Sequence, residues 1–328
     1  MRHMLFIFNE STDPYFNLAA EEFLVQNLSE EVFMIWRNHN TIVVGRNQNT
    51  LSEIHYDYVK EHDIQVVRRM SGGGTVFHDM GNVNFTFIVN SGDDFNNYRR
   101  FCEPVIGFLK TLGVTATLSG RNDILVDDKK ISGNAQYMYK NRVMHHGTLL
   151  YAASQDRISE ALKVSEDKIK SKGIKSVRSR VTNIGSHMET PISVEEFVEK
   201  FVDYMVKNIP DCKYYDLAQN EAEIRKLREE KYATWEWNYG YSPKYEFVRK
   251  KRFDAGCVEV HMDIAGTSEI KDIKLYGDFF SKVPVTELEQ KLQGLRHEAG
   301  AIEKALEDTD VSQYIAGITK EDFMTLLF

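Results

Sequence analysis

A run of three glycines beside two arginines is the part of the sequence best suited to chemistry. Residues 68–79 read Arg-Arg-Met-Ser-Gly-Gly-Gly-Thr-Val-Phe-His-Asp. Glycines let the backbone approach a ligand closely and turn its N–H groups toward anionic oxygens, and arginines supply fixed positive charge. The segment therefore predicts a binding site for an adenylate. The alternative is a flexible β-hairpin loop, which is what a glycine triplet by itself usually indicates.

The same segment does not fit two well-known phosphate-binding motifs. A P-loop needs Gly-Lys-Ser or Gly-Lys-Thr after its glycines, and residues 72–79 contain no lysine. A dinucleotide-binding motif needs a helix after its glycines, whereas the alternation from Val83 to Val89 predicts a strand. The glycine loop is therefore expected to join two strands.

Three later segments complete a recognisable set. Residues 120–123 read Gly-Arg-Asn-Asp, residues 130–135 read Lys-Ile-Ser-Gly-Asn-Ala, and residues 145–150 read His-His-Gly-Thr-Leu-Leu. In this order, and together with the glycine segment, they resemble the lipoate-protein ligase A family. The family's lipoate loop reads Arg-Arg-x-Ser-Gly-Gly-Gly-x-Val-x-His-Asp, and its lysine lies in a Lys-x-Ser-Gly segment.

The resemblance covers the whole chain and carries expectations about the fold. It includes a C-terminal accessory domain that is entered through Trp-Glu-Trp-Asn-Tyr-Gly at residues 235–240. It implies the α+β fold of the biotin and lipoate ligases, in which helices flank a mixed β-sheet related to the core of class II synthetases. A small α/β domain is expected to follow this catalytic domain.

The resemblance also implies an activity in two steps. Lipoate and ATP, with Mg²⁺, are expected to give lipoyl-adenylate and pyrophosphate, and an acceptor lysine then displaces AMP. The implied acceptors are lipoyl domains of 2-oxoacid dehydrogenase complexes and the glycine cleavage H protein. In this family the C-terminal domain closes over the site and reorients between the two steps.

The family's site residues can be carried over to the matching positions of this chain. Lys130 is implied to touch the lipoate carboxylate and the α-phosphate, where it would neutralise developing charge. The implied ATP or adenylate contacts are Arg69, Gly74, Thr75, Val76, Phe77, Asn122, Asp123 and Lys130. The implied lipoate contacts are Arg69, Ser71, Gly72, Gly73, His78 and Lys130. Asp123 is the candidate Mg²⁺ ligand, although an Asn-Asp pair at the start of a strand is more often part of a turn.

Two other polar features have simpler interpretations. His145 and His146 are expected to position loops or to occupy polar pockets, because the resemblance assigns them no metal or base role. Residues 163–180 are basic in a chain that is acidic overall, and such a run is usually a solvated face. Because it aligns with the family's adenylate-binding loop, we expect Lys163–Arg180 to cover the site and exclude water.

The predicted elements place these segments around a sheet. Strands are expected at 5–8, 32–36, 41–44, 64–69, 83–89, 123–126, 130–139 and 142–151. Helices are expected after Asp13-Pro14, at 98–112, after a capping box formed by Ser193 and Glu196, and at 216–231. Three further β-like runs between Tyr245 and Tyr276 place a domain boundary near Ser242. The expected domains are a catalytic lipoate- and ATP-binding domain, 1–242, and an accessory domain, 243–328.

Composition and charge narrow the class of protein. Of the 328 residues, 42% are hydrophobic and 27% are charged, which is typical of a globular protein. A net charge of -8 disfavours a nucleic-acid partner, and no stretch approaches the roughly 20 apolar residues of a membrane span. Cys102, Cys212 and Cys257 form no CxxC pair, so we expect no disulfide framework or zinc site, and a cytoplasmic location.

Three other functions remain as alternatives. A lipoyl or octanoyl transferase of the same fold would carry the acyl group on a cysteine, without ATP. Cys102 is expected to face the core of its helix, and the other two cysteines lie outside the motif-bearing segments. A biotin ligase would have a different glycine-rich loop. A protein that binds lipoyl domains without turnover would not need Lys130 or the intact loop.

Overall fold

The computed structural model describes residues 4–46, 48, 50–119, 122–162, 181–240, 247–253, 256–264, 269–277 and 283–328. The chain divides into two compact units, Met1–Ser242 and Pro243–Phe328. The expected cover segment, Lys163–Arg180, lies outside the described residues. Among the helices that are described, none has the length and apolar character needed to cross a bilayer.

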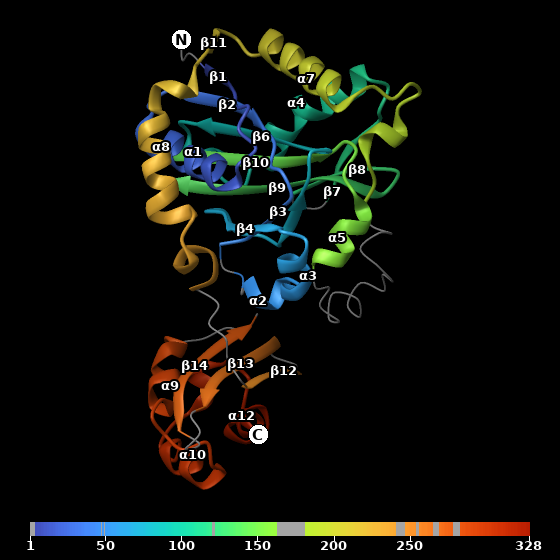
Figure 1. The fold of residues 1–328 in the computed structure, drawn as a ribbon. Coiled ribbons are helices and arrows are strands. Elements are labelled where there is room, and N and C mark those ends of the chain that lie inside the picture. Colours follow the sequence, from blue (N-terminus) through green and yellow to red (C-terminus); the bar gives the residue numbers. More distant parts are fainter. Residues whose placement is uncertain are drawn as a thin grey trace. The chain divides into compact units, whose positions relative to one another are not determined.

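The first unit is built on an eight-stranded mixed sheet (Figure 1). Its strands, in spatial order, are β11 (Cys212–Tyr214), β1 (Met4–Phe8), β2 (Glu31–Trp36), β6 (Asn82–Val89), β10 (Arg142–Leu150), β9 (Lys129–Tyr139), β8 (Asp123–Val126) and β7 (Thr117–Ser119). Strand β1 is parallel to both of its neighbours, and the other neighbouring strands are antiparallel. The mixed sheet with flanking helices confirms the predicted fold class.

A small second sheet carries the glycine segment. Its order is β4 (Gln65–Arg68), β3 (Thr41–Val44) and β5 (Val76–His78), with β3 parallel to β4 and antiparallel to β5. The glycine loop therefore connects β4 to β5, and only then does the chain enter β6. The glycine loop joins two strands, as predicted, but the second is β5 rather than the strand at 83–89; β5 was not predicted, because a three-residue strand is too short to produce a detectable alternation.

Helices cover both faces of the large sheet. Helices α4 (Tyr98–Thr111) and α7 (Val194–Asn208) contribute to one hydrophobic core, and α1 (Pro14–Asn27) and α8 (Glu221–Leu227) contribute to the other. On β6, Phe85 and Phe87 belong to the first core, whereas Ile88 belongs to the second. Side chains of a strand alternate between faces, so Asn84 and Thr86 project toward the side that α1 covers.

Capping residues begin helices α1 and α7, as predicted. Asp13 caps α1 by accepting from the backbone N–H of Tyr15, as its position before Pro14 predicts. Ser193 caps α7 by accepting from the N–H of Glu196, but the Glu196 carboxylate pairs with Lys200 instead of completing a capping box. The helix predicted at 216–231 is a 3₁₀ turn (Leu217–Asn220), then α8, then a π-helical turn (Arg228–Tyr232).

Several short helices connect these elements. They are α2 (Thr50–Glu53), α3 (Tyr56–Glu61), α5 (Gln155–Ala161) and the 3₁₀ turns Gly92–Asp94 and Ile184–His187, with a π-helical turn at Glu236–Gly240. The last of these turns is tied to the small sheet by Arg68, which donates to the carbonyl oxygens of Trp237 and Asn238. The end of the first unit is therefore anchored beside the glycine segment.

The second unit has a hydrophobic core of its own. Its antiparallel sheet contains β12 (Phe247–Phe253), β13 (Gly256–Ile264) and β14 (Ile270–Gly277), which correspond to the three predicted β-like runs. Helices α9 (Val285–Leu292), α10 (Ala299–Ala305), α11 (Val311–Tyr314) and α12 (Lys320–Leu327) follow.

A buried histidine makes the stability of the first unit depend on pH. His145 on β10 is fully buried, and its ring stacks on Phe101 with 4.6 Å between centroids. Its nitrogens contact the side-chain amides of Gln136 and Asn134, both at 3.2 Å. Burial, with a smaller contribution from His146, holds the pKa of His145 well below its ordinary value. Below a pH of about 6.5 the unfolded chain binds a proton that the native state does not bind.

We therefore predict that the free energy of unfolding of the first unit falls as the pH is lowered from 7.5 to 5.5. One such histidine contributes at most about 1.4 kcal/mol per pH unit. His145→Phe should be less stable at pH 7.5 but should show a flatter pH dependence. All three tryptophans belong to the first unit, so their fluorescence during urea unfolding reports on it alone. Equal slopes for wild type and variant would contradict the prediction.

Candidate active site

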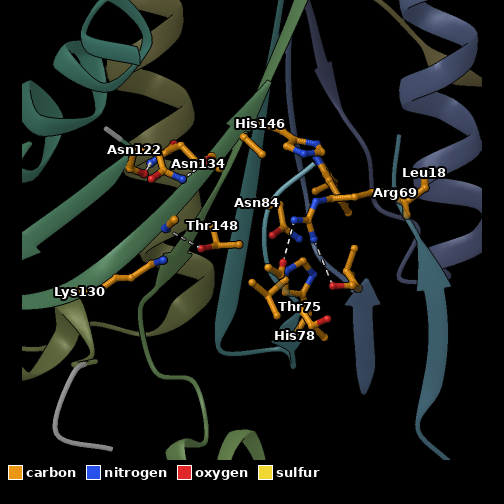
Figure 2. A pocket seen from close by; sticks show the side chains of 18 residues that line it. Leu18, Arg69, Thr75, His78, Asn84, Asn122, Lys130, Asn134, His146 and Thr148 are labelled. Atoms are coloured by element: carbon orange, nitrogen blue, oxygen red, sulfur yellow. Dashed lines mark hydrogen bonds between the residues drawn. The ribbon is translucent and has the colours of Figure 1, made fainter. Parts of the chain in front are cut away.

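A cavity of about 140 Å³ lies beside the glycine loop and is lined from both sheets of the first unit (Figure 2). The large sheet contributes Trp36, Asn84 and residues of β9 and β10, and the small sheet contributes Val43, Val76 and His78. Eight of the residues predicted from the sequence line it: Arg69, Gly73, Gly74, Thr75, Val76, His78, Asn122 and Lys130. The structure therefore brings together residues from segments up to 61 positions apart, counting from 69 to 130.

Four other predicted residues do not line the cavity. Ser71 is 1% exposed and its hydroxyl contacts Arg69 and His146, and the Gly72 carbonyl oxygen accepts from Arg69. The Phe77 side chain packs in a separate hydrophobic cluster, so only its backbone remains as a candidate ligand contact. Asp123 pairs with Lys130 at the edge of the site.

Arg69 holds the glycine loop in shape. Its Nε donates to Ser71 Oγ at 3.0 Å, its Nη1 donates to the Val43 carbonyl oxygen at 3.2 Å, and its Nη2 donates to two loop carbonyls. Those carbonyls belong to Gly72, at 2.7 Å, and to Gly74, at 2.8 Å. The sequence predicted a cation for the ligand; the structure shows that most of this guanidinium's donors bind the protein.

The Arg69 guanidinium is buried without losing its charge. Burial lowers its pKa to about 10, and the nearby carboxylate of Glu21 opposes that shift. At neutral pH it therefore remains a cation that lines the cavity beside Gly73 and Gly74. A buried charge of this kind is stable only when it is hydrogen-bonded and compensated.

The loop backbone needs glycine at two positions. Gly73 has a φ of +90°, a region that residues with a Cβ rarely adopt. A Cβ on Gly45 would lie 2.0 Å from the carbonyl oxygen of Gly73, so the backbone after β3 packs directly against the loop. The second of these glycines is far from the motif, and nothing in its sequence context singles it out.

A buried polar chain connects α1 to the loop. His146 Nδ1 lies 3.0 Å from Glu21 Oε1, and His146 Nε2 lies 2.6 Å from Ser71 Oγ. Thr86 Oγ1 donates to the same Glu21 oxygen at 2.6 Å. The order serine, histidine, carboxylate resembles a hydrolase triad. However, Ser71 Oγ already accepts from Arg69 and does not line the cavity, so the chain orients the loop rather than supplying a nucleophile.

Lys130 reaches the cavity from β9. Its Nζ lies 2.8 Å from Asp123 Oδ1, in an ion pair whose side chains are 34% and 37% exposed. A Cβ on Gly133 would lie 2.7 Å from this Nζ, so the glycine leaves the space in which the lysine side chain lies. Val181 bridges to Lys130 and the N–H of Thr182 donates to its carbonyl oxygen, which brings the chain after residue 180 beside the lysine.

Asn122 and Asn134 brace each other on the same side of the cavity (Figure 2). The Asn122 amide donates to the Asn134 carbonyl oxygen at 2.7 Å, and the Asn134 amide donates to the Asn122 carbonyl oxygen at 3.1 Å. Thr148 Oγ1 accepts from the N–H of Gly133. These contacts fix the backbone on either side of Lys130.

Ten further residues line the cavity that the sequence did not predict as ligand contacts. Gly133, Asn134, Ala135, His146, Gly147 and Thr148 belong to segments that were noted as motifs, but they were assigned no ligand contact. Leu18, Trp36, Val43 and Asn84 come from ordinary core elements and carried no signal. Leu18, Trp36, Val43 and Val76 give the cavity an apolar slot.

The described residues provide neither a reactive cysteine in the cavity nor a cluster of metal ligands. Burial raises the pKa of the Cys102 thiol to about 12, and burial also raises that of Cys212. Cys257 belongs to the second unit, and none of the three, all of them described, is among the lining residues. Among the described residues, no group of three or more His, Cys, Asp or Glu side chains is arranged to hold a metal ion.

The chain is similar to proteins of one known family over almost its whole length. A model described as the lipoyl protein ligase A/B catalytic domain matches residues 13–206, and one described as the bacterial lipoate protein ligase C-terminus matches residues 242–327. The lipoate-protein ligase LplJ of Bacillus subtilis is 44% identical over 335 residues, which cover 99% of this chain and 100% of that protein.

Solved structures give the same result. LipL1 of P. falciparum, in complex with lipoate, superposes with a TM-score of 0.66 at 25% identity, covering 98% of this chain and 97% of that one. A lipoate-protein ligase A bound with ATP gives 0.62 at 25% identity, covering 73% and 99%. A bipartite ligase from Thermoplasma acidophilum, described with its E2 lipoyl domain, gives 0.65 at 27% identity, covering 75% and 100%. Its matching domains, full-length identity and shared fold show that this chain belongs to the lipoate-protein ligase family.

Proposed function

We propose that the chain activates lipoate with ATP and transfers the lipoyl group to a lysine of an acceptor protein. In the first step a lipoate carboxylate oxygen attacks the α-phosphorus of ATP, and the P–O bond to pyrophosphate breaks. In the second step the acceptor amine attacks the acyl carbon of lipoyl-adenylate, and AMP leaves as the amide forms. One observation carries the proposal: Lys130, a shaped glycine loop and an apolar slot meet in one cavity.

Each part of that cavity suits one part of the reaction. Leu18, Trp36, Val43 and Val76 provide apolar surface for the acyl chain. The Lys130 ammonium can stabilise charge between the carboxylate and the α-phosphate, where two anions must approach. Arg69 keeps the loop fixed, so that the N–H groups around Gly74 require no reorganisation when the phosphate binds.

The ion pair of Lys130 with Asp123, about a third exposed, suits exchange for a ligand. An ion pair this exposed contributes little stability, so a phosphate or carboxylate can replace it at small cost. Mg²⁺ is usually held by one or two carboxylates together with substrate phosphates, and it would offset phosphate charge. The single carboxylate of Asp123 fits such a role if ATP supplies the other ligands.

The proposed acceptors are lipoyl domains of 2-oxoacid dehydrogenase complexes and the glycine cleavage H protein. The family supports this choice, and the archaeal relative described with an E2 lipoyl domain supports it further. Cys102, Cys212 and Cys257, all among the described residues, form no disulfide, which is consistent with the proposed cytoplasmic location because reducing compartments disfavour disulfides. A pyrophosphate-release assay with ATP, Mg²⁺ and lipoate, followed by mass spectrometry of an acceptor domain, tests both steps.

We predict that Lys130→Ala lowers the rate of lipoyl-adenylate formation by roughly 10² to 10³ while the protein stays folded, because the developing charge loses its cation. The measurement is single-turnover formation of the adenylate. Lys129→Ala is the matched control, since Lys129 is an exposed neighbour on the same strand that does not line the cavity. Wild-type rates in Lys130→Ala would remove this lysine from the mechanism.

Gly133→Ala gives a second test of the same lysine. The added methyl group would occupy the space of the Lys130 ammonium, and the flexible lysine end can move away without disturbing the backbone. The variant should therefore fold normally and form the adenylate more slowly than wild type.

We predict that Arg69→Ala weakens binding of ATP and lipoate and that Arg69→Lys does not restore it. A single ammonium cannot contact Ser71, Val43 and both loop carbonyls in the geometry of a guanidinium. Calorimetry measures both affinities, and Arg99→Ala, at an exposed site on α4, controls for loss of charge. Unchanged affinities in Arg69→Ala would show that the loop keeps its shape without the clamp.

We predict that replacing Cys102, Cys212 and Cys257 together by alanine leaves acyl transfer within a few-fold of wild type, apart from a small loss of stability at the buried Cys102. An anhydride with AMP needs no thiolate, and the pKa of Cys102 is far from that of a reactive thiol. Lipoylation of an acceptor domain is the assay. Loss of transfer in the folded variant, or an ATP-independent, hydroxylamine-labile acyl group on the wild type, would favour the transferase alternative.

A further inference from the structure

Two buried nitrogen atoms of cavity-lining residues have no hydrogen-bond partner among the described residues. They are Nε2 of His78, on β5, and Nδ2 of Asn84, on β6. The residues are 3% and 1% exposed. Folded proteins satisfy nearly all buried polar groups, so a pair of orphans in one cavity indicates a ligand that supplies the missing partners.

The orientation of neighbouring side-chain amides determines which ring nitrogen of His78 carries the proton. The Asn17 amide nitrogen donates to the backbone oxygens of Ser11 and Arg37, which fixes its orientation. It also donates to Asn38 Oδ1 at 2.9 Å, so the nitrogen of Asn38 is the atom that lies 3.2 Å from His78 Nδ1. Nδ1 therefore accepts, and the ring carries its proton on Nε2.

The Nε2–H of His78 is consequently a donor that has no acceptor among the described residues. Burial, together with Arg69 and His146, lowers the pKa of His78 to about 3, so the ring is neutral at physiological pH. At Asn84, Oδ1 accepts from the Asn82 amide nitrogen at 2.9 Å, and neither Asn84 Nδ2 nor Asn82 Oδ1 has a partner among the described residues; of these two atoms, only Nδ2 belongs to a residue that lines the cavity. His78 and Asn84 thus present uncharged N–H groups.

These donors belong to the part of the cavity away from the lysine. Figure 2 shows Lys130 and Asn122 on one side of the pocket and His78 and Asn84 on the other. The apolar lining residues Trp36 and Val43 come from the strands that neighbour β6 and β5. A bound acid whose carboxylate meets Lys130 would therefore extend its far end toward His78 and Asn84.

We propose that His78 and Asn84 form a donor pair that binds the two sulfur atoms of the lipoate ring and so selects lipoate over a plain fatty acid. The inference rests on the proposed function and deepens it by assigning the determinant of acyl selectivity. Ring sulfurs are neutral, polarizable and weak acceptors, which suits neutral donors in apolar surroundings. A hydrocarbon tail would leave both N–H groups unsatisfied, and a site built to hydrogen-bond a substrate discriminates against analogues that lack the partner.

The test compares lipoate with two acids that lack sulfur. Lipoate, 5-cyclopentylpentanoate, which has the same ring size with carbon in place of sulfur, and octanoate are supplied with ATP and Mg²⁺. The value of kcat/KM is obtained from pyrophosphate release. Wild type should prefer lipoate over the carbocyclic acid by roughly threefold to tenfold for each donor, the effect of one modest hydrogen bond.

Removing the donors should remove the preference. His78→Phe and Asn84→Leu should each lower the lipoate to carbocycle ratio by roughly threefold to tenfold, mainly through slower turnover of lipoate. His62→Phe, at an exposed histidine outside the cavity, should keep the wild-type ratio. Urea unfolding of each variant establishes that it is folded.

The outcomes separate the inference from the proposed function. If no acid yields pyrophosphate with the wild type, the ligase proposal fails. If the wild type turns over all three acids with a lipoate to carbocycle ratio near one, the ligase proposal stands and the donor pair is refuted, whatever the variants do. A ratio that persists unchanged in folded His78→Phe and Asn84→Leu would also refute it.

Discussion

The guanidinium of Arg69 is the group on which the site depends. A glycine-rich loop has more accessible conformations than any other segment of its length, and ordering it requires compensating contacts. Arg69 supplies four such contacts from one side chain, including those to Gly72 and Gly74 on either side of the loop's centre. The loop can then present backbone N–H groups in a fixed arrangement, which is the condition for electrostatic stabilisation without reorganisation.

The surrounding elements make a buried cation possible. Glu21 of α1 supplies the compensating carboxylate, and His146 of β10 connects that carboxylate to Ser71 and so to the guanidinium. Arg69 needs both the compensating carboxylate and the hydrogen bonds, because its charge is deeply buried and desolvation already lowers its pKa. Helix α1 and the large sheet thus stabilise the loop electrostatically as well as by packing.

Lys130 differs from Arg69 in both its exposure and the number of its partners. It is paired once, with Asp123, and remains a third exposed, whereas Arg69 is buried and bound on several sides. The first arrangement leaves a charge that can exchange partners when ligands arrive, and the second gives a charge that maintains a shape. The two steps proposed for this site would use both kinds of cation.

Much of this protein could be read from its sequence. The segments 68–79, 120–123, 130–135 and 145–150 indicated the family, and local rules correctly placed the cap at Asp13 and most strands of the large sheet, because turns, caps and alternation act within a few residues. The three-residue strand β5, the clamp on the loop by Arg69, the apolar slot with Trp36 and the orphaned donors at His78 and Asn84 could not be read. Each of these depends on which atoms become neighbours across strands and helices that are distant in sequence, and such contacts are decided only when the two sheets and α1 pack together.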